Sequence, residues 1–355
     1  MKVAFLLNHL KFANGVSRAV IQIANLLARE GHHVTIYPLF SFEKGISAQL
    51  ECNVQVKKIF GFYFRGMERL VDFIPYKFLY RNIVRDEYDV EVAFQYGLST
   101  KIIAHSDNCR AKHICWMHGY DEGLILKKYY LKMDEIYTVS KDSAIRLKRE
   151  LKGVNKIDYC YNLIDSDKII QLSKEDSGVG HFDGKTFISV GRLSPEKGYD
   201  RLLKCIYELK NEGYNFRLIL VGDGPQKSHL ENIAQKLELK NRVIFVGESK
   251  NPHKYTKDAD CYICSSYHEG FSIASVEAVI LGIPVITTNV GGARELIEES
   301  QSGMVVAQSD EGLLKGIRYV LDNPEINQQW KNTLLNTKNK FLYKNRVNQV
   351  LKIFG

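Results

Sequence analysis

The strongest constraint on the fold is a repeated alternation of short apolar runs with longer segments of helical spacing. In the first half, apolar runs predict strands at 2–7, 33–39, 54–60, 90–95, 112–117, 134–139 and 156–161. In the second half, they predict strands near 186–190, 216–221, 242–246, 261–265, 284–288 and 303–307. Strands that alternate with helices form parallel sheets with crossover helices. The sequence therefore predicts an α/β protein with two doubly wound parallel sheets.

The length of 355 residues suits two domains, each large enough to bury its own core. A polar, glycine-rich stretch at 173–184 favours a linker or its immediate flank. We expect a Rossmann-like domain over 1–165 and a second one over 166–335. The stretch after Pro324 carries no strand signal, and we expect a C-terminal helix at 336–355 that returns to the first domain.

Composition and cysteine spacing exclude several classes of protein. The longest apolar stretches fall well short of the roughly 18 residues of a spanning helix, and the apolar run at the N-terminus is too short for a signal-peptide core. Seven cysteines without paired spacing favour a reducing compartment, so we expect a cytoplasmic protein. Cys261 and Cys264 spell C-x-x-C, but in a buried strand they face opposite sides, which argues against a metal or redox pair.

The segment 57–85 holds much of the net charge of +8, with seven Lys or Arg against two acids. Its cations are interleaved with Phe, Tyr, Ile and Leu, a mixture that suits the surface of an anionic bilayer. An amphipathic helical pair with a solvated basic face explains it equally well. No nucleic-acid module signature accompanies the segment, so we expect no nucleic-acid partner. The two remaining interpretations leave a cytoplasmic protein or one peripheral on the inner face of the cell membrane.

Two loops that follow predicted strands carry groups suited to an anionic ligand. Arg192 and Lys197 bracket a turn after the strand at 186–190, where two cations can grip a diphosphate. After the strand at 261–265, Glu269 lies in the loop and Glu277 in the second turn of a helix. Ser272 is placed to cap that helix, whose free N–H groups and dipole favour a phosphate.

Together these motifs resemble the retaining family 4 glycosyltransferases of the GT-B fold. The resemblance rests on motifs in a fixed order across 186–300. They are Gly191-Arg192 to Lys197-Gly198, Gly222-Asp223-Gly224, the Glu269-x7-Glu277 pair, Gly282-x-Pro284-Val285-Ile286 and Gly291-Gly292-x-x-Glu295. The first half contributes Asn14-Gly15-Val16, Trp116-Met117-His118-Gly119 and Tyr161-Asn162-Leu163-Ile164-Asp165. The first loop has one glycine where many relatives have two, and Ser272 and Leu163 stand where glycine is common.

The resemblance implies two Rossmann-like domains that face each other across a cleft, and a role for each motif residue. Arg192 and Lys197 would neutralise the donor diphosphate as the sugar leaves, in place of a metal ion. Glu269 would contact hydroxyls of the donor sugar, and Glu277 would take the ribose hydroxyls. His118 would hydrogen-bond a sugar hydroxyl, although a lone His also fits a core position. The remaining donor-binding positions are Gly15, Gly191, Gly222, Gly270, Phe271 and Ser272, of which Phe271 and Ser272 would offer backbone N–H groups to phosphate.

The implied reaction moves a hexose or N-acetylhexosamine from a nucleotide-sugar to a glycan or lipid-linked acceptor in surface polysaccharide synthesis, such as capsule or lipopolysaccharide. A UDP-sugar is the first choice of donor, with GDP-mannose second. A donor phosphate oxygen would accept the acceptor's proton, so no protein base is assigned. Asp258-Ala259-Asp260 spells D-x-D but precedes a buried strand, and we expect neither a metal nor a cofactor. Two alternatives stay open: a nucleotide-sugar epimerase or hydrolase, and a nonenzymatic degenerate transferase that serves as a partner subunit.

Overall fold

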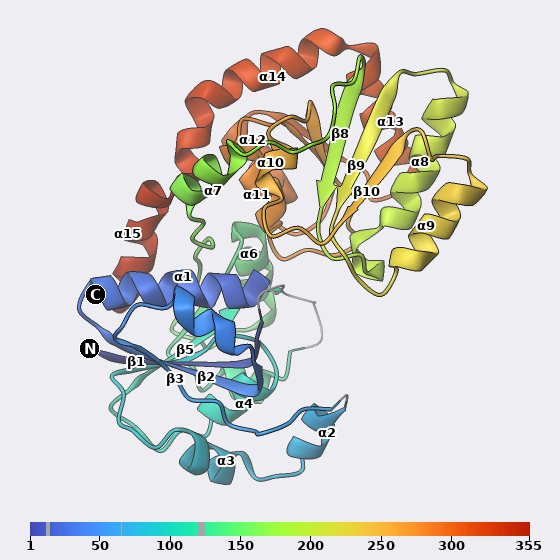
Figure 1. The fold of residues 1–355 in the computed structure, drawn as a ribbon. Helices are drawn as coiled ribbons and strands as arrows, with labels where there is room; N and C mark the ends of the chain where they lie inside the picture. Colours follow the sequence, from blue (N-terminus) through green and yellow to red (C-terminus); the bar gives the residue numbers. More distant parts are fainter. Residues whose placement is uncertain (12–14, 65, 120–124) are drawn as a thin grey trace. The chain divides into compact units, whose positions relative to one another are not determined.

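A computed structural model describes residues 1–11, 15–64, 66–119 and 125–355 of the chain (Figure 1). The chain divides into two compact units. The first comprises Met1–Leu163 with Val347–Gly355, and the second comprises Ile164–Arg346. This division lies close to the boundary expected between residues 165 and 166, and the expected linker at 173–184 falls inside the second unit.

The first unit contains a seven-stranded parallel sheet with the order β3-β2-β1-β4-β5-β6-β7. Its strands are β1 (Lys2–Leu10), β2 (His33–Phe42), β3 (Val54–Val56), β4 (Val90–Ala93), β5 (Lys112–Met117), β6 (Glu135–Thr138) and β7 (Lys156–Tyr159). All seven runs predicted from the sequence form strands. The third ends at Val56 instead of residue 60, although the Phe60 N–H still donates to the Leu39 carbonyl over 2.9 Å.

Helices cover both faces of the first sheet. Its helices are α1 (Gly15–Arg29), the 3-10 helix η1 (Lys44–Gln49), α2 (Met67–Val71), α3 (Tyr76–Ile83), α4 (Leu98–Ile103), α5 (Lys127–Tyr130) and α6 (Lys141–Glu150). Alternate residues of a strand face opposite sides. Leu6 accordingly joins the core formed with α2 to α6, whereas the neighbouring Phe5 contacts the C-terminal helix on the other side.

The chain returns to the first unit through α15 (Tyr343–Phe354). The Phe354 ring lies 6.0 Å from Phe5 and 6.4 Å from Trp116, centroid to centroid. The Gln349 side-chain amide donates to the Tyr159 carbonyl over 3.0 Å. The returning part begins at Val347, later than the 336 expected, because 336–346 belong to the second unit.

The second unit contains a six-stranded parallel sheet with the order β10-β9-β8-β11-β12-β13. Its strands are β8 (Lys185–Val190), β9 (Phe216–Val221), β10 (Val243–Gly247), β11 (Cys261–Cys264), β12 (Val285–Thr288) and β13 (Gly303–Val306). Its helices are α7 (Ser166–Ser173), η2 (Pro195–Lys197), α8 (Tyr199–Asn211), α9 (Lys227–Lys236), α10 (His253–Thr256), α11 (Ile273–Ile280), α12 (Ala293–Ser300), α13 (Asp310–Asp322), α14 (Pro324–Thr337) and η3 (Lys338–Phe341). Helices α8, α9 and α13 share one apolar core with the strands, while α11 and α12 pack on β11 and β12 (Figure 1).

Each sheet has one point where the strand order reverses, between β1 and β4 in the first unit and between β8 and β11 in the second. Ligands of doubly wound sheets bind beyond the carboxyl ends of the strands at such a switch point. The loops after β8 and β11 are therefore where a ligand of the second unit is expected. Of the described helices, none combines the length and apolar character that a membrane span requires.

Candidate active site

The two loops at the switch point of the second sheet are bonded to each other. Residues 191–198 follow β8 and residues 265–272 follow β11, and the two strands are neighbours in the sheet. The Tyr267 N–H donates to the Glu196 carbonyl over 2.7 Å, and the Ser265 hydroxyl donates to the Lys197 carbonyl over 2.9 Å. The loop predicted to hold the diphosphate therefore supports the loop predicted to contact the sugar.

The loop after β8 packs closely against the loops after β11 and β9, and each contact requires a glycine. Gly198 has φ +63°, and a Cβ there would overlap the carbonyl oxygen of Ser265. Gly222, which follows β9, has φ +147°, and a Cβ there would overlap the carbonyl oxygen of Gly191. Residues other than glycine rarely adopt these backbone conformations. The predicted positions Gly191 and Gly222 thus lie in direct contact and bring the ends of β8 and β9 together.

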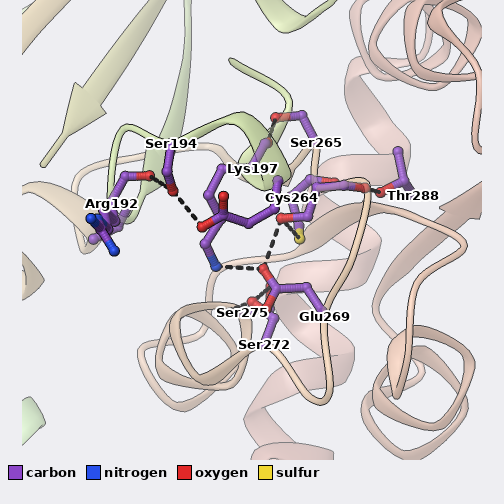
Figure 2. Close-up of polar contacts among 12 residues, drawn as sticks. Arg192, Ser194, Lys197, Cys264, Ser265, Glu269, Ser272, Ser275 and Thr288 are labelled. Atoms are coloured by element: carbon purple, nitrogen blue, oxygen red, sulfur yellow. Dashed lines mark hydrogen bonds and ion pairs between the residues drawn. The ribbon is translucent and has the colours of Figure 1, made fainter. Parts of the chain in front are cut away.

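Lys197 and Glu269 form the central ion pair of the site (Figure 2). The Lys197 ammonium donates to Glu269 Oε1 over 2.6 Å, and the Ser266 hydroxyl donates to the same oxygen over 2.7 Å. Burial lowers the pKa of Lys197, but the charge and hydrogen bond of Glu269 outweigh it and hold the pKa above its ordinary value. Lys197 is therefore a fixed cation at neutral pH, with its side chain 27% exposed.

Arg192 provides a second cation on the same loop. The residue is exposed, and its guanidinium forms no ion pair within the described part of the chain. Figure 2 shows the guanidinium outside the hydrogen-bonded group of Lys197 and Glu269. Arg192 is therefore accessible from solvent, and a guanidinium binds phosphate oxygens in a bidentate manner.

Helix α11 begins where the sequence predicts. Ser272 is its N-cap, and the hydroxyl accepts from the Ser275 N–H over 3.3 Å. Gly270 and Phe271 lead into the helix, with Phe271 only 8% exposed. Glu277 lies in the second turn and is 7% exposed, so both carboxylates predicted for this loop and helix are mostly buried. A mostly buried carboxylate binds a hydroxyl without competition from much water.

Two predicted residues, His118 and Gly15, belong to the first unit. Gly15 is the first residue of α1, and its neighbour Asn14 lies outside the described residues. His118 follows β5 and packs against Phe94 with the ring centroids 4.5 Å apart and the rings tilted by 56°. Burial lowers the pKa of His118 to about 3, so the imidazole is neutral at physiological pH. Its Nε2 is buried with no hydrogen-bond partner among the described residues, which leaves it able to bond a ligand hydroxyl.

Two other sequence signatures have structural partners. Asp260, in the D-x-D sequence, accepts from the Thr186 N–H over 2.9 Å and lies within 3.7 Å of Lys185 and 3.5 Å of Lys331. Cys261 and Cys264 are both buried in β11, and burial raises the pKa of the Cys261 thiol to about 12. Asp260 and Cys261 therefore lie at the amino end of β11, whereas Cys264 ends the strand and its thiol contacts the Ser266 hydroxyl over 3.6 Å.

Sequence reasoning did not single out Ser266 or Tyr267, which hold Glu269 and its loop in place. Ser266 lies three positions before Glu269 in the sequence and is buried, at 3% exposure. A hydroxyl three positions before a loop carboxylate is the signal that identifies it, although the spacing alone is common. The ring of Tyr267 contacts the guanidinium of Arg201 in helix α8, a contact between distant segments that leaves no local signal in the sequence.

The match to known families agrees with this geometry. The family model described as Glycosyltransferase Family 4 matches residues 13–168, and that described as Glycosyl transferases group 1 matches residues 174–336. Together they cover both units. The chain belongs to the family 4 glycosyltransferases.

Individual relatives extend over most of the chain. An uncharacterized glycosyltransferase of Haemophilus influenzae is 25% identical over 92% of both chains. A Campylobacter jejuni relative, N-acetylgalactosamine-N,N'-diacetylbacillosaminyl-diphospho-undecaprenol 4-alpha-N-acetylgalactosaminyltransferase, is 27% identical over 73% of this chain and 70% of its own. The solved structure of Anabaena HepE in complex with UDP-glucose has a TM-score of 0.78 at 20% identity, over 100% of this chain and 99% of that one. The fold is GT-B.

Proposed function

We propose that this chain is a retaining, metal-independent glycosyltransferase that uses a UDP-sugar. It moves a hexose or N-acetylhexosamine to a glycan or lipid-linked acceptor in surface polysaccharide synthesis. The observation that carries the proposal is the 2.6 Å Lys197–Glu269 pair beside exposed Arg192 at the switch point of the second sheet. Support comes from the family, from the Campylobacter relative named for a diphospho-undecaprenol acceptor, and from HepE, which binds UDP-glucose.

The donor diphosphate binds between Arg192 and Lys197. An ammonium has three donors, so Lys197 keeps its bond to Glu269 and still donates to phosphate. The N–H groups of Phe271 and Ser272 add donors at the start of α11, where the helix dipole favours negative charge. Glu277 takes the ribose hydroxyls from the second turn of the same helix.

The chemistry requires the site to stabilise negative charge on the leaving diphosphate. The bond from the sugar C1 to the UDP oxygen breaks, and a bond to the acceptor oxygen forms on the same face of the sugar. The acceptor proton passes to the departing phosphate oxygen. Fixed cations in a partly buried site stabilise this charge more strongly than in water, which is the role that a metal ion has in other transferases. Glu269 and neutral His118 bond sugar hydroxyls.

The direct test is turnover in EDTA. The protein is incubated with UDP-glucose, UDP-galactose, UDP-GlcNAc or UDP-GalNAc, and UDP release and product configuration are followed by ¹H NMR. We expect one donor to be consumed without metal, with the α configuration of the released or transferred sugar retained. Inversion contradicts the retaining mechanism, and activity that appears only on addition of Mg²⁺ or Mn²⁺ contradicts metal independence.

The same spectra separate the two alternative functions. An epimerase converts one UDP-sugar into another with no gain in free UDP, and a hydrolase releases reducing sugar at a rate that no acceptor increases. A nonenzymatic partner subunit binds UDP but consumes none of the four donors. The intact Arg192, Lys197, Glu269 and Glu277 argue against the nonenzymatic partner, because a degenerate site is not expected to keep a desolvated ion pair.

We also propose that the segment 57–85 contacts an anionic bilayer. It forms the pair α2 and α3 with their flanking loops, and four phenylalanines on it are strongly exposed: Phe62 at 68%, Phe64 at 48%, Phe73 at 85% and Phe78 at 61%. Exposed aromatic side chains of this kind mark interaction surfaces. Several cations are already paired, since Lys57 bonds Asp86 and both Lys77 and Arg81 bond Asp107. We therefore expect the exposed aromatic side chains to contribute more to bilayer binding than the basic side chains do.

Vesicle sedimentation tests the membrane contact. We expect the protein to sediment with phosphatidylglycerol vesicles, and the variant Phe62→Ser, Phe73→Ser, Phe78→Ser to remain in the supernatant. Leu335→Ser is the control, because Leu335 is an equally exposed apolar residue, at 66%, on the second unit. Equal binding of the triple variant and the control variant contradicts the proposal, as does failure of the wild-type protein to bind at low salt.

A further inference from the structure

A fully buried arginine lies directly behind the site loops. Arg201 is in the first turn of α8, 0% exposed, and it is among the largest fully buried side chains of the chain. None of its three guanidinium nitrogens has a hydrogen-bond partner among the residues that the structure describes. A guanidinium stays charged at any physiological pH, and burying a charge without a partner is costly.

The guanidinium of Arg201 contacts the aromatic ring of Tyr267. The guanidinium carbon lies 3.6 Å from the ring centroid, a stacked cation–π contact. Such contacts are stronger when the groups are removed from water, and the Arg201 guanidinium is fully buried. No carboxylate forms an ion pair with Arg201 within the described part of the chain. The stack is therefore the main compensation for the buried charge.

Tyr267 is part of the loop that carries the site carboxylate. Its N–H donates to the Glu196 carbonyl over 2.7 Å, and its own carbonyl accepts from the Gln308 side chain. On one side of it Ser266 bonds Glu269, and beyond that Ser265 bonds the Lys197 carbonyl. Tyr267 therefore lies within the stretch 265–269, whose bonds join the loop after β11 to the loop after β8.

Arg201 is also close to the backbone of the first loop. A Cβ at Gly198 would lie 2.8 Å from Arg201 Nε and would overlap the Ser265 carbonyl oxygen. The guanidinium therefore fills the space beneath the junction of the two loops. The guanidinium of Arg201 thus lies close to both Gly198 and the Tyr267 ring.

We propose that Arg201 is a positioning residue of the donor site. By stacking on Tyr267 it fixes the loop of Glu269 against the loop of Lys197 and so sets the geometry of the Lys197–Glu269 pair. Arg201 does not touch the donor and acts through Tyr267. The proposal rests on the proposed function for its effect on nucleotide affinity, but its structural part is measurable without any substrate.

Hydrogen exchange of the full-length chain is the first measurement. Arg201→Met replaces the buried charge by an apolar side chain of similar length, so the variant is expected to fold. We expect exchange across 265–272 to become about tenfold faster in Arg201→Met and in Tyr267→Leu, which corresponds to about 1.4 kcal/mol. Tyr267→Phe keeps the ring, and its exchange across 265–272 should match that of the wild type. The double variant Arg201→Met, Tyr267→Leu should be no faster than either single variant, because both remove the same contact.

A matched control separates positioning from a general effect on the unit. Arg242 also faces an aromatic ring, that of Phe216, at 5.7 Å, but it precedes β10 at the opposite end of the sheet. Arg242→Met should leave exchange across 265–272 unchanged. Unchanged exchange of that segment in Arg201→Met overturns the proposal. Equal acceleration in Tyr267→Phe and Tyr267→Leu does so as well.

Binding of UDP, measured without metal, connects the stack to the site. We expect Arg201→Met and Tyr267→Leu to bind UDP about tenfold more weakly, with Tyr267→Phe and Arg242→Met close to wild type. Wild-type affinity in Arg201→Met, combined with faster loop exchange, contradicts the positioning role. If the wild-type protein itself binds no UDP, the proposed function fails, while the exchange result still decides whether Arg201 holds the loop.

Discussion

The two units of this chain share a doubly wound topology and differ in the residues that follow their strands. In the second unit, the loops after β8 and β11 present Arg192 and the Lys197–Glu269 pair. In the first unit, His118 follows β5, the strand next to β4, and burial keeps its imidazole neutral by lowering the pKa to about 3. The fold places loops at a switch point, but the residues of the loops decide the ligand. The second unit presents two cations beside a carboxylate, and the first presents a neutral imidazole.

The comparison can be followed experimentally because each unit holds one of the two tryptophans. Trp116 is fully buried in β5 of the first unit, and Trp330 packs against the core of the second. In single-tryptophan variants, Trp330→Phe reports on the first unit and Trp116→Phe on the second. The effect of a substitution can then be assigned to its own unit.

The largest effect is expected from Gly222→Ala in the second unit. The new Cβ would overlap the Gly191 carbonyl, and φ is +147°. We expect a loss of about 3 kcal/mol in the free energy of unfolding, measured in urea from Trp330, together with weaker UDP binding. Gly213→Ala is the control, because φ is +86° there but no atom lies within 4 Å of the new Cβ. It should cost about 1 kcal/mol. Equal losses would contradict the close contact of the two loops.

A pH effect of intermediate size is expected in the first unit. The folded pKa of His118 lies near 3, below its ordinary value of 6.5, because burial disfavours the charged imidazole. The unfolded chain therefore binds a proton between these values that the folded chain does not. This stabilising contribution is present above pH 6.5 and is lost as the pH falls, by about 2 kcal/mol between pH 7 and pH 5.

The measurement for this second prediction is urea unfolding at pH 5, 6 and 7, followed through Trp116. His118→Asn removes the titrating group, and the dependence on pH should become shallower by about 2 kcal/mol over this range. Burial also lowers the pKa of His9, which lies in the same unit, so some dependence should remain in the variant. An unchanged slope in His118→Asn would show that this imidazole titrates normally and is not the neutral donor or acceptor described here.

The smallest effect is expected from the cap of α11. Ser272→Ala removes the hydroxyl that accepts from Ser275 and should cost about 1 kcal/mol of stability, with a severalfold loss of UDP affinity. Ser309 caps α13 in the same way, accepting from the Gly312 N–H over 3.0 Å. Ser309→Ala should lose the same stability and keep full affinity. Loss of affinity in both variants would mean that the start of α11 has no special relation to the phosphate.

Local sequence patterns were sufficient for the strands and for the identity of the site loops. Parallel strands buried on both faces appear as continuous apolar runs, which is why all thirteen predicted runs form strands. Cap chemistry is equally local, and Ser272 was identified from its position before an apolar helix. Arg192, Lys197 and Glu269 follow strand ends, so topology alone brings them to one edge.

Contacts between distant segments could not be predicted in the same way. The stack of Arg201 on Tyr267 joins a helix to a loop that follows a different strand, and each residue alone suggests a surface position. The pairing of the cations of segment 57–85 is long-range in the same way, because Asp86 and Asp107 lie outside it, contact three of its cations and offset two of its charges.

The central claim is that Arg192 and Lys197 hold a nucleoside diphosphate in the second unit without metal. Calorimetric titration with UDP, GDP, ADP and CDP in EDTA tests it most directly, on the wild type and on the Arg192→Ala, Lys197→Ala variant. Lys204→Ala is the control, since Lys204 is an exposed lysine of the adjacent helix α8. The account predicts that UDP binds tightest and that the double variant loses at least about a hundredfold in affinity while the control does not. Equal affinity in all three proteins, or binding of none of the four nucleotides, would contradict it.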